Sequence, residues 1–469
     1  MTEPLIVGVM VRTLGAYPSG WRYPGAHADP QTDAAVLRRI ARVAEDADLD
    51  YLFFGDWLAT GPDLEFRDPY LLARIDPLSA ALYLAGVTEH IGLIATVNST
   101  YADPYATARA TASLDLLTGG RAGINLVTGA EPRAAANHGR DAHADNETRY
   151  DRAGEFVRAL RLLWESWDAD AWIADTATGV LIDADRLRPA AFAGTQVRVE
   201  GPLNVARPPQ AHPPIVHAGT SPRSRALAAA EADLALIAAG DPAVAAATRA
   251  ELRALAEASG RDPDDLKVIV PVVPVVAATV AAARAIVDRL LLLVPIDDGA
   301  SDHARRTAFP QNRSLTSFLD VAEIGPDDPM REASIDDAVP PGTAGRFAEA
   351  AAQTLDVVAA RTGRDLGGSH PVTWRHLIAA HAVPANFVVG SPQAIADHFE
   401  LWRDAGATDG FNVLSAFQPA QFEAFTSLAV PELRRRGLIG RSGATLRDRL
   451  GLGSPCLLHD SAPAAATGR

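Results

Sequence analysis

Small and hydroxylated residues follow a short apolar run at 214–216 and precede an alanine-rich segment with arginines in its first turns. Where a strand ends and a helix starts, the first N–H groups of the helix lack intrahelical partners and the helix dipole favours an anion. Gly219 would let the backbone approach a ligand closely, and Thr220 and Ser221 would add hydroxyl donors. The pattern leaves two interpretations open, a phosphate site and an ordinary N-cap at Ser221 followed by Pro222.

Two further polar residues follow apolar runs. Asp56 comes directly after 51–55 in FFGDWLA, and Asn125 lies near the end of the run in GINLVTG. If these runs are strands of a barrel, a carboxylate just beyond the strand faces the mouth, where barrel enzymes carry their chemistry. An amide that points into such a mouth needs donors and acceptors as partners. We therefore expect both residues to contact a ligand, with a solvated loop acid or a helix cap as the alternative for Asp56.

Short apolar runs alternate with segments of helical periodicity along most of the chain. The expected strands are 5–11, 51–55, 91–96, 121–127, 214–216, 268–276, 386–389 and 410–414, and the expected helices include 32–46, 78–84, 105–117, 153–167, 243–258, 278–293, 345–361 and 393–405. Repeated βα units predict a parallel sheet with helices outside. Because no early GxGxxG motif indicates an open dinucleotide-binding sheet, a closed (β/α)₈ TIM barrel with insertions at the C-terminal ends of its strands fits best.

Three stretches depart from this alternation. We expect one domain over residues 1–440, interrupted by insertions at about 168–213 and 295–380. Residues 295–341 combine Asp, Pro and Ser with few apolar anchors, which predicts a long surface loop that could act as a lid. Residues 441–469 are expected to form an appended arm, with a role in oligomer contacts, and a tail.

Composition excludes several classes of protein. The 469 residues carry a net charge of −15, which argues against nucleic acid and anionic membranes as partners. No run approaches the ~18 apolar residues of a membrane span, and residues 1–10 resemble a strand instead of an export signal. The single cysteine, Cys456, and the absence of an HExxH motif leave no support for a disulfide framework or a metal site. A cytoplasmic location is expected.

Several motifs in order make the chain similar to a known family. They include SGWRYP, YLFFGDWLA, IGLIATVNSTYADPYATAR, LDLLTGGRAGINLVTGA, ETRYDRAGEF, GPLNVARPPQAHPPIVHAGTSPRSR and GFNVL. Together they resemble the flavin-dependent monooxygenases of the bacterial luciferase-like superfamily, in the branch with nitrilotriacetate and dibenzothiophene-sulfone monooxygenases. The resemblance implies a TIM barrel that uses FMN, as FMNH₂ from a separate NAD(P)H:flavin reductase, and O₂ to oxygenate a small organic substrate. It also implies a homodimer or homotetramer.

The resemblance also implies the residues of a flavin site. Thr96 matches a position against the isoalloxazine ring, with Asn98 close by, and Asp56 and Asn125 match positions that contact the flavin. Tyr150 matches a tyrosine that reaches the phosphate or ribityl chain. Thr220 and Ser221 match the phosphate site, which agrees with the pattern described above.

Departures from the family pattern concern histidines. Asn146, four residues before Tyr150, stands where the family usually has a histidine, so a hydrogen bond could persist there but not a titrating charge. The family also has a histidine near the N-terminus, and this chain has Ala16 or Tyr17 at that position. We therefore take His138 in ANHGRD as the candidate catalytic acid or base, with Tyr17 as the alternative, whereas His217 ends an apolar strand and is expected to be a satisfied core residue.

Two other functions stay open on the sequence. One is a deazaflavin-dependent oxidoreductase of the same superfamily, and the other is a flavin-binding protein that lost its activity with the missing histidines. The substrate is expected to be organic with some apolar surface. Arg22 and Arg133 are candidate partners for an anionic group on it.

Overall fold

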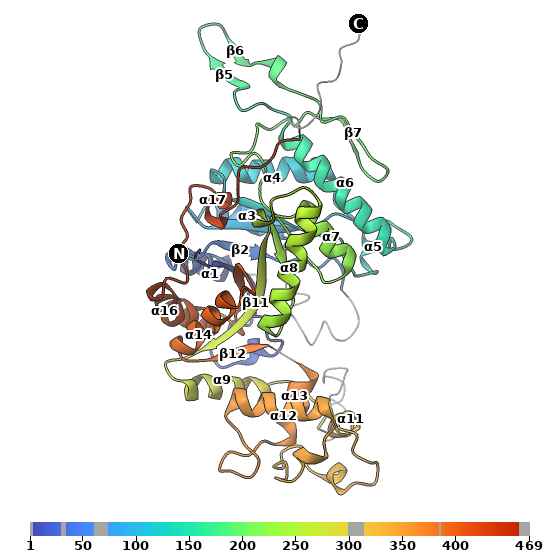
Figure 1. The fold of residues 1–469 in the computed structure, drawn as a ribbon, viewed down its shortest axis with the longest axis vertical. Helices are drawn as coiled ribbons and strands as arrows, with labels where there is room; N and C mark the ends of the chain where they lie inside the picture. The colour runs from blue at the N-terminus through green and yellow to red at the C-terminus, as the bar shows by residue number, and fades with distance from the viewer. Residues whose placement is uncertain (1–2, 30–33, 61–73, 299–313, 384–385, 459–469) are drawn as a thin grey trace.

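The computed structural model describes residues 3–29, 34–60, 74–298, 314–383 and 386–458. Eight parallel strands close into a barrel in the order β10-β9-β4-β3-β2-β1-β13-β11, because β10 also pairs with β11 (Figure 1). They are β1 (Ile6–Met10), β2 (Tyr51–Phe54), β3 (Gly92–Asn98), β4 (Ala122–Val127), β9 (Ile215–Ala218), β10 (Leu234–Leu236), β11 (Lys267–Val276) and β13 (Gly410–Val413). A further strand, β12 (Phe387–Gly390), pairs with the last residues of β11. The predicted TIM barrel is confirmed.

Helices cover the outside of the barrel, as the alternation predicted. They are α1 (Ala34–Asp46), α3 (Pro77–Ala85), α4 (Pro104–Thr118), α5 (Ala134–Asn137), α6 (Asn146–Trp164), α7 (Pro222–Glu231), α8 (Pro242–Ala258), α14 (Pro392–Asp404), α15 (Ala420–Ala424) and α16 (Val430–Arg435), with short η1 (Gly20–Arg22), η4 (Pro263–Asp265) and η7 (Phe425–Ala429). On α6 the periodic Phe156, Leu160 and Leu163 are buried, and Asp145 caps its first turn. No helix among the described residues is long and apolar enough to cross a membrane.

The chain beyond residue 440 differs from the expected arm. Its helix α17 (Leu446–Leu450) closes the N-terminal end of the barrel, and Leu446 and Leu450 join the interior cluster that contains Ile6 and Phe53. Gly92 and Gly123 lack side chains at the places where Leu446 enters. Residues 441–458 thus contribute to the barrel core, because leucines spaced four apart on one helical turn can fill the open end of a barrel.

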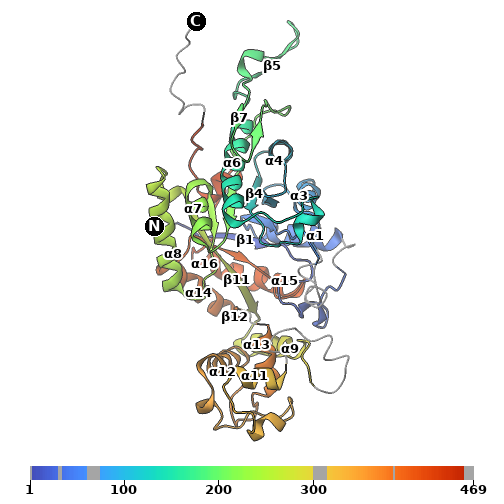
Figure 2. The same cartoon turned by 90° about the vertical axis from the view of Figure 1, so that its right-hand side faces the viewer.

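The first insertion forms two antiparallel hairpins, although its polar sequence indicated an irregular excursion. The strands pair as β5 (Trp172–Asp175) with β6 (Val180–Ile182) and as β7 (Phe192–Ala193) with β8 (Arg198–Val199), and η3 (Ala184–Arg186) joins them. The β5–β6 hairpin projects away from the barrel in both views (Figures 1 and 2). Its apolar side chains are exposed, among them Trp172 and Leu181.

The second insertion forms a helical lobe beyond β12 (Figure 1). It consists of α9 (Val280–Leu292), α11 (Leu315–Val321), α12 (Glu349–Thr362) and α13 (Trp374–Ala382), with η5 (Pro329–Glu332) and η6 (Ala344–Arg346). The expected surface loop at 295–341 instead supplies Phe318, Ile335 and Val339 to a core that Trp374 completes. These apolar residues are too widely spaced to form a periodic pattern, so the polar residues between them obscured the core. Residues 299–313 lie outside the described part.

Candidate functional site

A cavity of about 310 Å³ opens at the C-terminal ends of β2, β3, β4 and β9. Loop and strand-end residues from these four strands and the start of α6 line it: Asp56, Trp57, Leu58, Asn98, Val127, Thr128, Gly129, Ala130, Glu131, Ala134, Tyr150, Ala218 and Gly219. Three residues predicted from widely separated motifs, Asp56, Asn98 and Tyr150, therefore face one space. The volume is that of a small-molecule site.

The floor of this region contains Asn125. It lies two residues before Val127, which lines the cavity, so both side chains point into the barrel. Its Nδ2 donates to Thr96 Oγ1 at 3.0 Å, while its Oδ1 is buried without a hydrogen-bond partner among the described residues. A buried carbonyl oxygen without a donor costs free energy. Asn125 therefore presents an acceptor that a bound ligand with an N–H group would satisfy.

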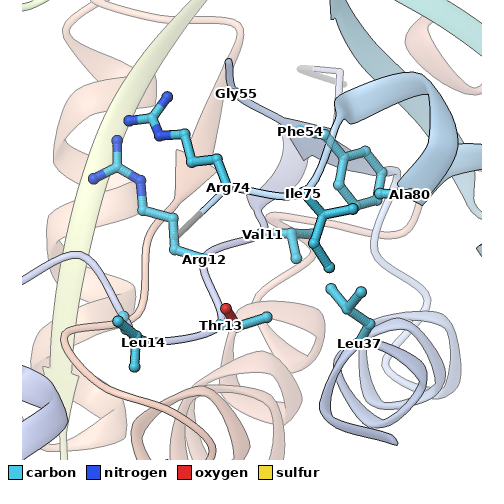
Figure 3. Close-up of a pocket in the computed structure, with 11 residues that line it drawn as sticks. Val11, Arg12, Thr13, Leu14, Leu37, Phe54, Gly55, Arg74, Ile75 and Ala80 are labelled. Carbon is cyan, nitrogen blue, oxygen red and sulfur yellow. The ribbon is translucent and has the colours of Figure 1, made fainter. Parts of the chain in front are cut away.

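Asp56 lies at the rim, half-buried. Burial raises the pKa of its carboxyl, whereas the backbone N–H of Trp57, which donates to Oδ1 at 2.8 Å, and the charge of Arg74 lower it. Arg74 also donates to the Asp56 backbone oxygen at 2.9 Å. Figure 3 shows Arg74 beside Arg12 in an adjoining hollow of about 40 Å³, with both guanidinium groups pointing the same way.

The start of α7 has the geometry of a helix N-cap. Ser221 Oγ accepts from the N–H of Ser224 at 3.2 Å, so Ser221 caps the helix, as one of the two interpretations of the sequence expected. The Ser221 hydroxyl hydrogen is not used in that bond, so capping and anion binding are compatible. Thr220 is exposed. A Cβ on Gly219 would overlap Ser224 Oγ and approach Tyr150 Oη to 3.7 Å, so only glycine fits this wall.

His217 lies behind this turn. Its Nδ1 is 2.7 Å from the backbone oxygen of Leu126, and its Nε2 is 2.9 Å from Ser224 Oγ. Both ring nitrogens are thus engaged, and burial lowers the pKa of the imidazole. The prediction of a satisfied core histidine is confirmed.

The arginines of α7 form ion pairs with acidic side chains. Arg223 pairs with Glu147 at 2.9 Å and with Asp151 at 3.4 Å, and Arg225 pairs with Glu251 at 2.7 Å. The N–H groups of the helix and the hydroxyl groups at its start are therefore the more direct donors to an anion at this end of α7.

His138 lies at the outer edge of the site, and it is exposed. Its ring stacks on that of Tyr101, with centroids 4.4 Å apart and an interplanar angle of 13°. Tyr101 Oη is 2.7 Å from Nδ1 of His143, whose Nε2 is buried without a partner among the described residues. Asn146, at the start of α6, is exposed, and its Oδ1 accepts from Arg149 at 3.2 Å. Sequence reasoning missed His143, because the 42 positions between it and Tyr101 hide the pair.

Tyr17 lies elsewhere. It is 2% exposed and packs against Phe387, with ring centroids 5.2 Å apart, in the core of the helical lobe. Burial raises the pKa of its phenol well above the usual value. The structure does not bring Tyr17 to the cavity that Asp56 and Tyr150 line, and burial makes it a poor proton donor.

The two arginines expected to meet an anionic substrate have protein partners. Arg22 donates to the backbone oxygen of Leu293, and Arg133 forms an ion pair with Glu131 at 2.6 Å. This pair holds the pKa of the Glu131 carboxyl at about 2. No cluster of three or more His, Cys, Asp or Glu side chains in the described part of the chain is arranged to hold a metal ion.

Asn412 on β13 was not singled out from the sequence. It is 0% exposed, and neither amide atom has a partner among the described residues. Since Phe411 packs outward against Phe399, with centroids 4.1 Å apart, Asn412 points into the barrel. The only sequence signal is a polar residue within the apolar run GFNVL.

Comparisons with known proteins agree with this arrangement. Residues 19–409 match the family described as Luciferase-like monooxygenase. The chain is 34% identical to nitrilotriacetate monooxygenase component A of Aminobacter aminovorans over 462 residues, which cover 96% of each chain. It is also 34% identical to dibenzothiophene-sulfone monooxygenase of Rhodococcus erythropolis, with 93% of this chain and 94% of the relative covered. The crystal structure of DmoA from Hyphomicrobium sulfonivorans superposes with a TM-score of 0.75 at 26% identity, covering 96% of this chain and 92% of that one.

Proposed function

Because the chain belongs to the luciferase-like monooxygenase family, we propose that it is the oxygenase component of a two-component system that uses reduced FMN and O₂ to oxygenate a small organic substrate. The observation that carries the proposal is the cavity at the strand ends, where Asp56, Asn98, Tyr150 and Gly219 converge above the unsatisfied carbonyl oxygen of Asn125. The word component in the name of the nitrilotriacetate relative supports a separate reductase as the partner.

The residues of the cavity fit FMN at both of its ends. A flavin ring offers an N–H group on its pyrimidine edge, and Asn125 Oδ1 offers the acceptor that such a group needs. Thr96, Asn98 and Asp56 surround that end. Tyr150 and the turn from Gly219 to Ser221 would hold the phosphate. When bound, reduced FMN supplies the electrons that activate O₂ for transfer of one oxygen atom to the substrate.

The protein's own contribution is orientation, exclusion of water and proton handling. Trp57, Leu58 and Ala134 form an apolar side of the cavity that limits water at the ring. His138 lies near enough to Asp56 to lower the pKa of that carboxyl. We therefore assign proton transfer at the rim to His138. The Tyr101–His143 pair lies beside it, and this chain has Asn146 at the position where the family usually has a histidine.

Anaerobic titration of the purified protein with reduced FMN, followed by exposure to O₂, tests this function. We expect saturable binding of reduced FMN and slower reoxidation of the bound than of the free flavin. Gly219→Ala should weaken the binding, and Gly86→Ala is the matched control because a Cβ there meets nothing within 4 Å. Failure of reduced FMN to bind, together with binding of a reduced deazaflavin, would contradict the proposal and favour a hydride-transfer enzyme.

We also propose that the protein is a homodimer or homotetramer. The exposed apolar side chains of the β5–β6 hairpin, including Trp172 (55% exposed) and Leu181 (54%), support an interface there. Light scattering should give a mass of at least twice the 49.4 kDa of one chain. Trp172→Ser should shift that mass downward, and a monomer in the unmodified protein would contradict this part of the proposal.

A further inference from the structure

The helical lobe contains a cavity of about 550 Å³ that is larger than the one at the barrel mouth. Helices α9, α12 and α13 and the start of β12 line it, and Val357 on its wall is 38% exposed, so the cavity opens to solvent. It shares no lining residue with the barrel-mouth cavity. Much of its wall is apolar, formed by Val287, Leu291, Val357, Val358, Val383 and Phe387. A hollow of this size, with a mostly apolar wall and a few polar groups, is a common form of small-molecule site.

The polar groups in this cavity include one cation, the guanidinium of Arg361, and the imidazole of His381. The guanidinium of Arg361 donates to Asn386 Oδ1 at 3.2 Å. His381 also lines the cavity, and its Nε2 is buried without a hydrogen-bond partner in the part of the chain that the structure describes. Burial lowers the pKa of both side chains, which indicates apolar surroundings. A guanidinium set in an apolar wall favours a ligand with an acceptor group, above all an anionic one.

The position of the cavity links the lobe to the N-terminal segment of the chain. Phe387 lines the cavity and also packs against Tyr17, at 5.2 Å between ring centroids. Tyr17 lies in the segment that follows β1. Its backbone N–H donates to the backbone oxygen of Ala416, just beyond β13, at 3.2 Å. A molecule in the lobe would therefore contact Phe387, which packs in the lobe core and lies on the strand that pairs with β11 of the barrel.

We propose that the lobe cavity is a second binding site, for a small organic molecule with an apolar body and a carboxylate or sulfonate end. The apolar body lies against Val287, Leu291 and Val357, and the acidic end lies at Arg361 and His381. This site is separate from the flavin site, and it does not depend on the function proposed for the barrel mouth.

The probe for the experiment is 8-anilinonaphthalene-1-sulfonate, which combines an aromatic body with one sulfonate. Its fluorescence is titrated with the full-length folded protein, with and without FMN. Val357→Trp fills the cavity, and Val244→Trp is the matched control, because Val244 is exposed on α8 far along the chain from the lobe. Arg361→Gln tests the anionic end, with the uncharged N-phenyl-1-naphthylamine as the comparison ligand.

We expect one saturable site that FMN does not displace. Val357→Trp should abolish the saturable binding, while Val244→Trp should leave it intact. Arg361→Gln should lower the affinity for the sulfonate probe by about tenfold, the usual effect of losing one charge-assisted hydrogen bond. It should lower the affinity for the uncharged ligand less. If Val357→Trp does not fold, Ala380→Leu narrows the same cavity.

Three results would overturn the proposal: unchanged probe binding in the filled variant, displacement of the probe by FMN, or equal weakening of both ligands by Arg361→Gln. The affinity for reduced FMN is measured on the same samples. Loss of probe binding with normal FMN binding identifies the lobe site alone. Absence of FMN binding would count against the barrel-mouth function without affecting the lobe site.

Discussion

Replacing Asn125 with leucine should separate ligand binding from stability at the floor of the barrel-mouth cavity. Leucine has the same branching and the same number of side-chain heavy atoms as asparagine, but it replaces both amide atoms with methyl groups. The lost bond from Nδ2 to Thr96 Oγ1, at 3.0 Å, costs about 1 kcal/mol. The removal of the unsatisfied Oδ1 gains roughly 1–3 kcal/mol. The free energy of unfolding without ligand should therefore stay level or rise by up to about 2 kcal/mol.

Binding of reduced FMN should change in the opposite direction. If Asn125 Oδ1 accepts a hydrogen bond from the flavin ring, its loss should weaken binding by about 1.4 kcal/mol, or roughly tenfold in Kd. Urea unfolding of the ligand-free protein and anaerobic fluorescence titration measure the two quantities on the same preparation.

Asn204→Leu is the control for this experiment, since Asn204 is an exposed amide outside the cavity that accepts from Tyr105 at 3.4 Å. Its flavin affinity should be unchanged. The reasoning about Asn125 fails if the leucine variant binds reduced FMN normally. It also fails if the variant loses stability by more than about 2 kcal/mol, because Asn125 would then be a structural residue.

Three further predictions concern positions away from the flavin ring. Gly219→Ala should weaken FMN binding by about tenfold or more, because the added Cβ displaces the Ser224 hydroxyl from His217; unchanged affinity in a calorimetric titration would contradict this. Asn412→Leu should raise the free energy of unfolding by about 1–3 kcal/mol, since it removes two unsatisfied buried atoms; a loss in urea unfolding would show that the amide has a partner. Burial raises the pKa of the Asp115 carboxyl to about 6, so the folded protein holds that proton more tightly than the unfolded chain. Stability should therefore fall by up to about 3 kcal/mol as the pH rises from about 4 to about 6.5, and Asp115→Asn should flatten this slope in urea unfolding at each pH.

Local patterns predicted the barrel and part of its site. The strands β4 and β11 and the helix α8 agree with the expected ranges to within one residue, because an apolar run and an amphipathic period depend on neighbours in the sequence. The same logic located Asp56 and Asn125. In a parallel barrel, residues at or just beyond the C-terminal ends of the strands meet at one mouth, independent of the conformation of the loops.

The places of other residues depended on contacts that no local pattern reveals. Tyr17 follows the first strand as a mouth residue would, yet it is buried against Phe387, 370 positions later. His143 lies three residues before Asn146, the position at which the family usually has a histidine. Its hydrogen bond with Tyr101 is what relates it to the site. Asn146 is at a helix start, where its side chain faces outward.

The family, the parallel barrel and the polar residues at the strand ends could be predicted from the amino-acid sequence, because they follow from short-range periodicity and from motifs whose order is preserved. Three properties emerge from the tertiary structure: α17 closes the barrel, α9 and residues 314–383 build a lobe with its own cavity, and particular polar groups stay without partners among the described residues. Those properties arise where segments hundreds of residues apart pack together, and the burial of each polar atom depends on all of the side chains around it.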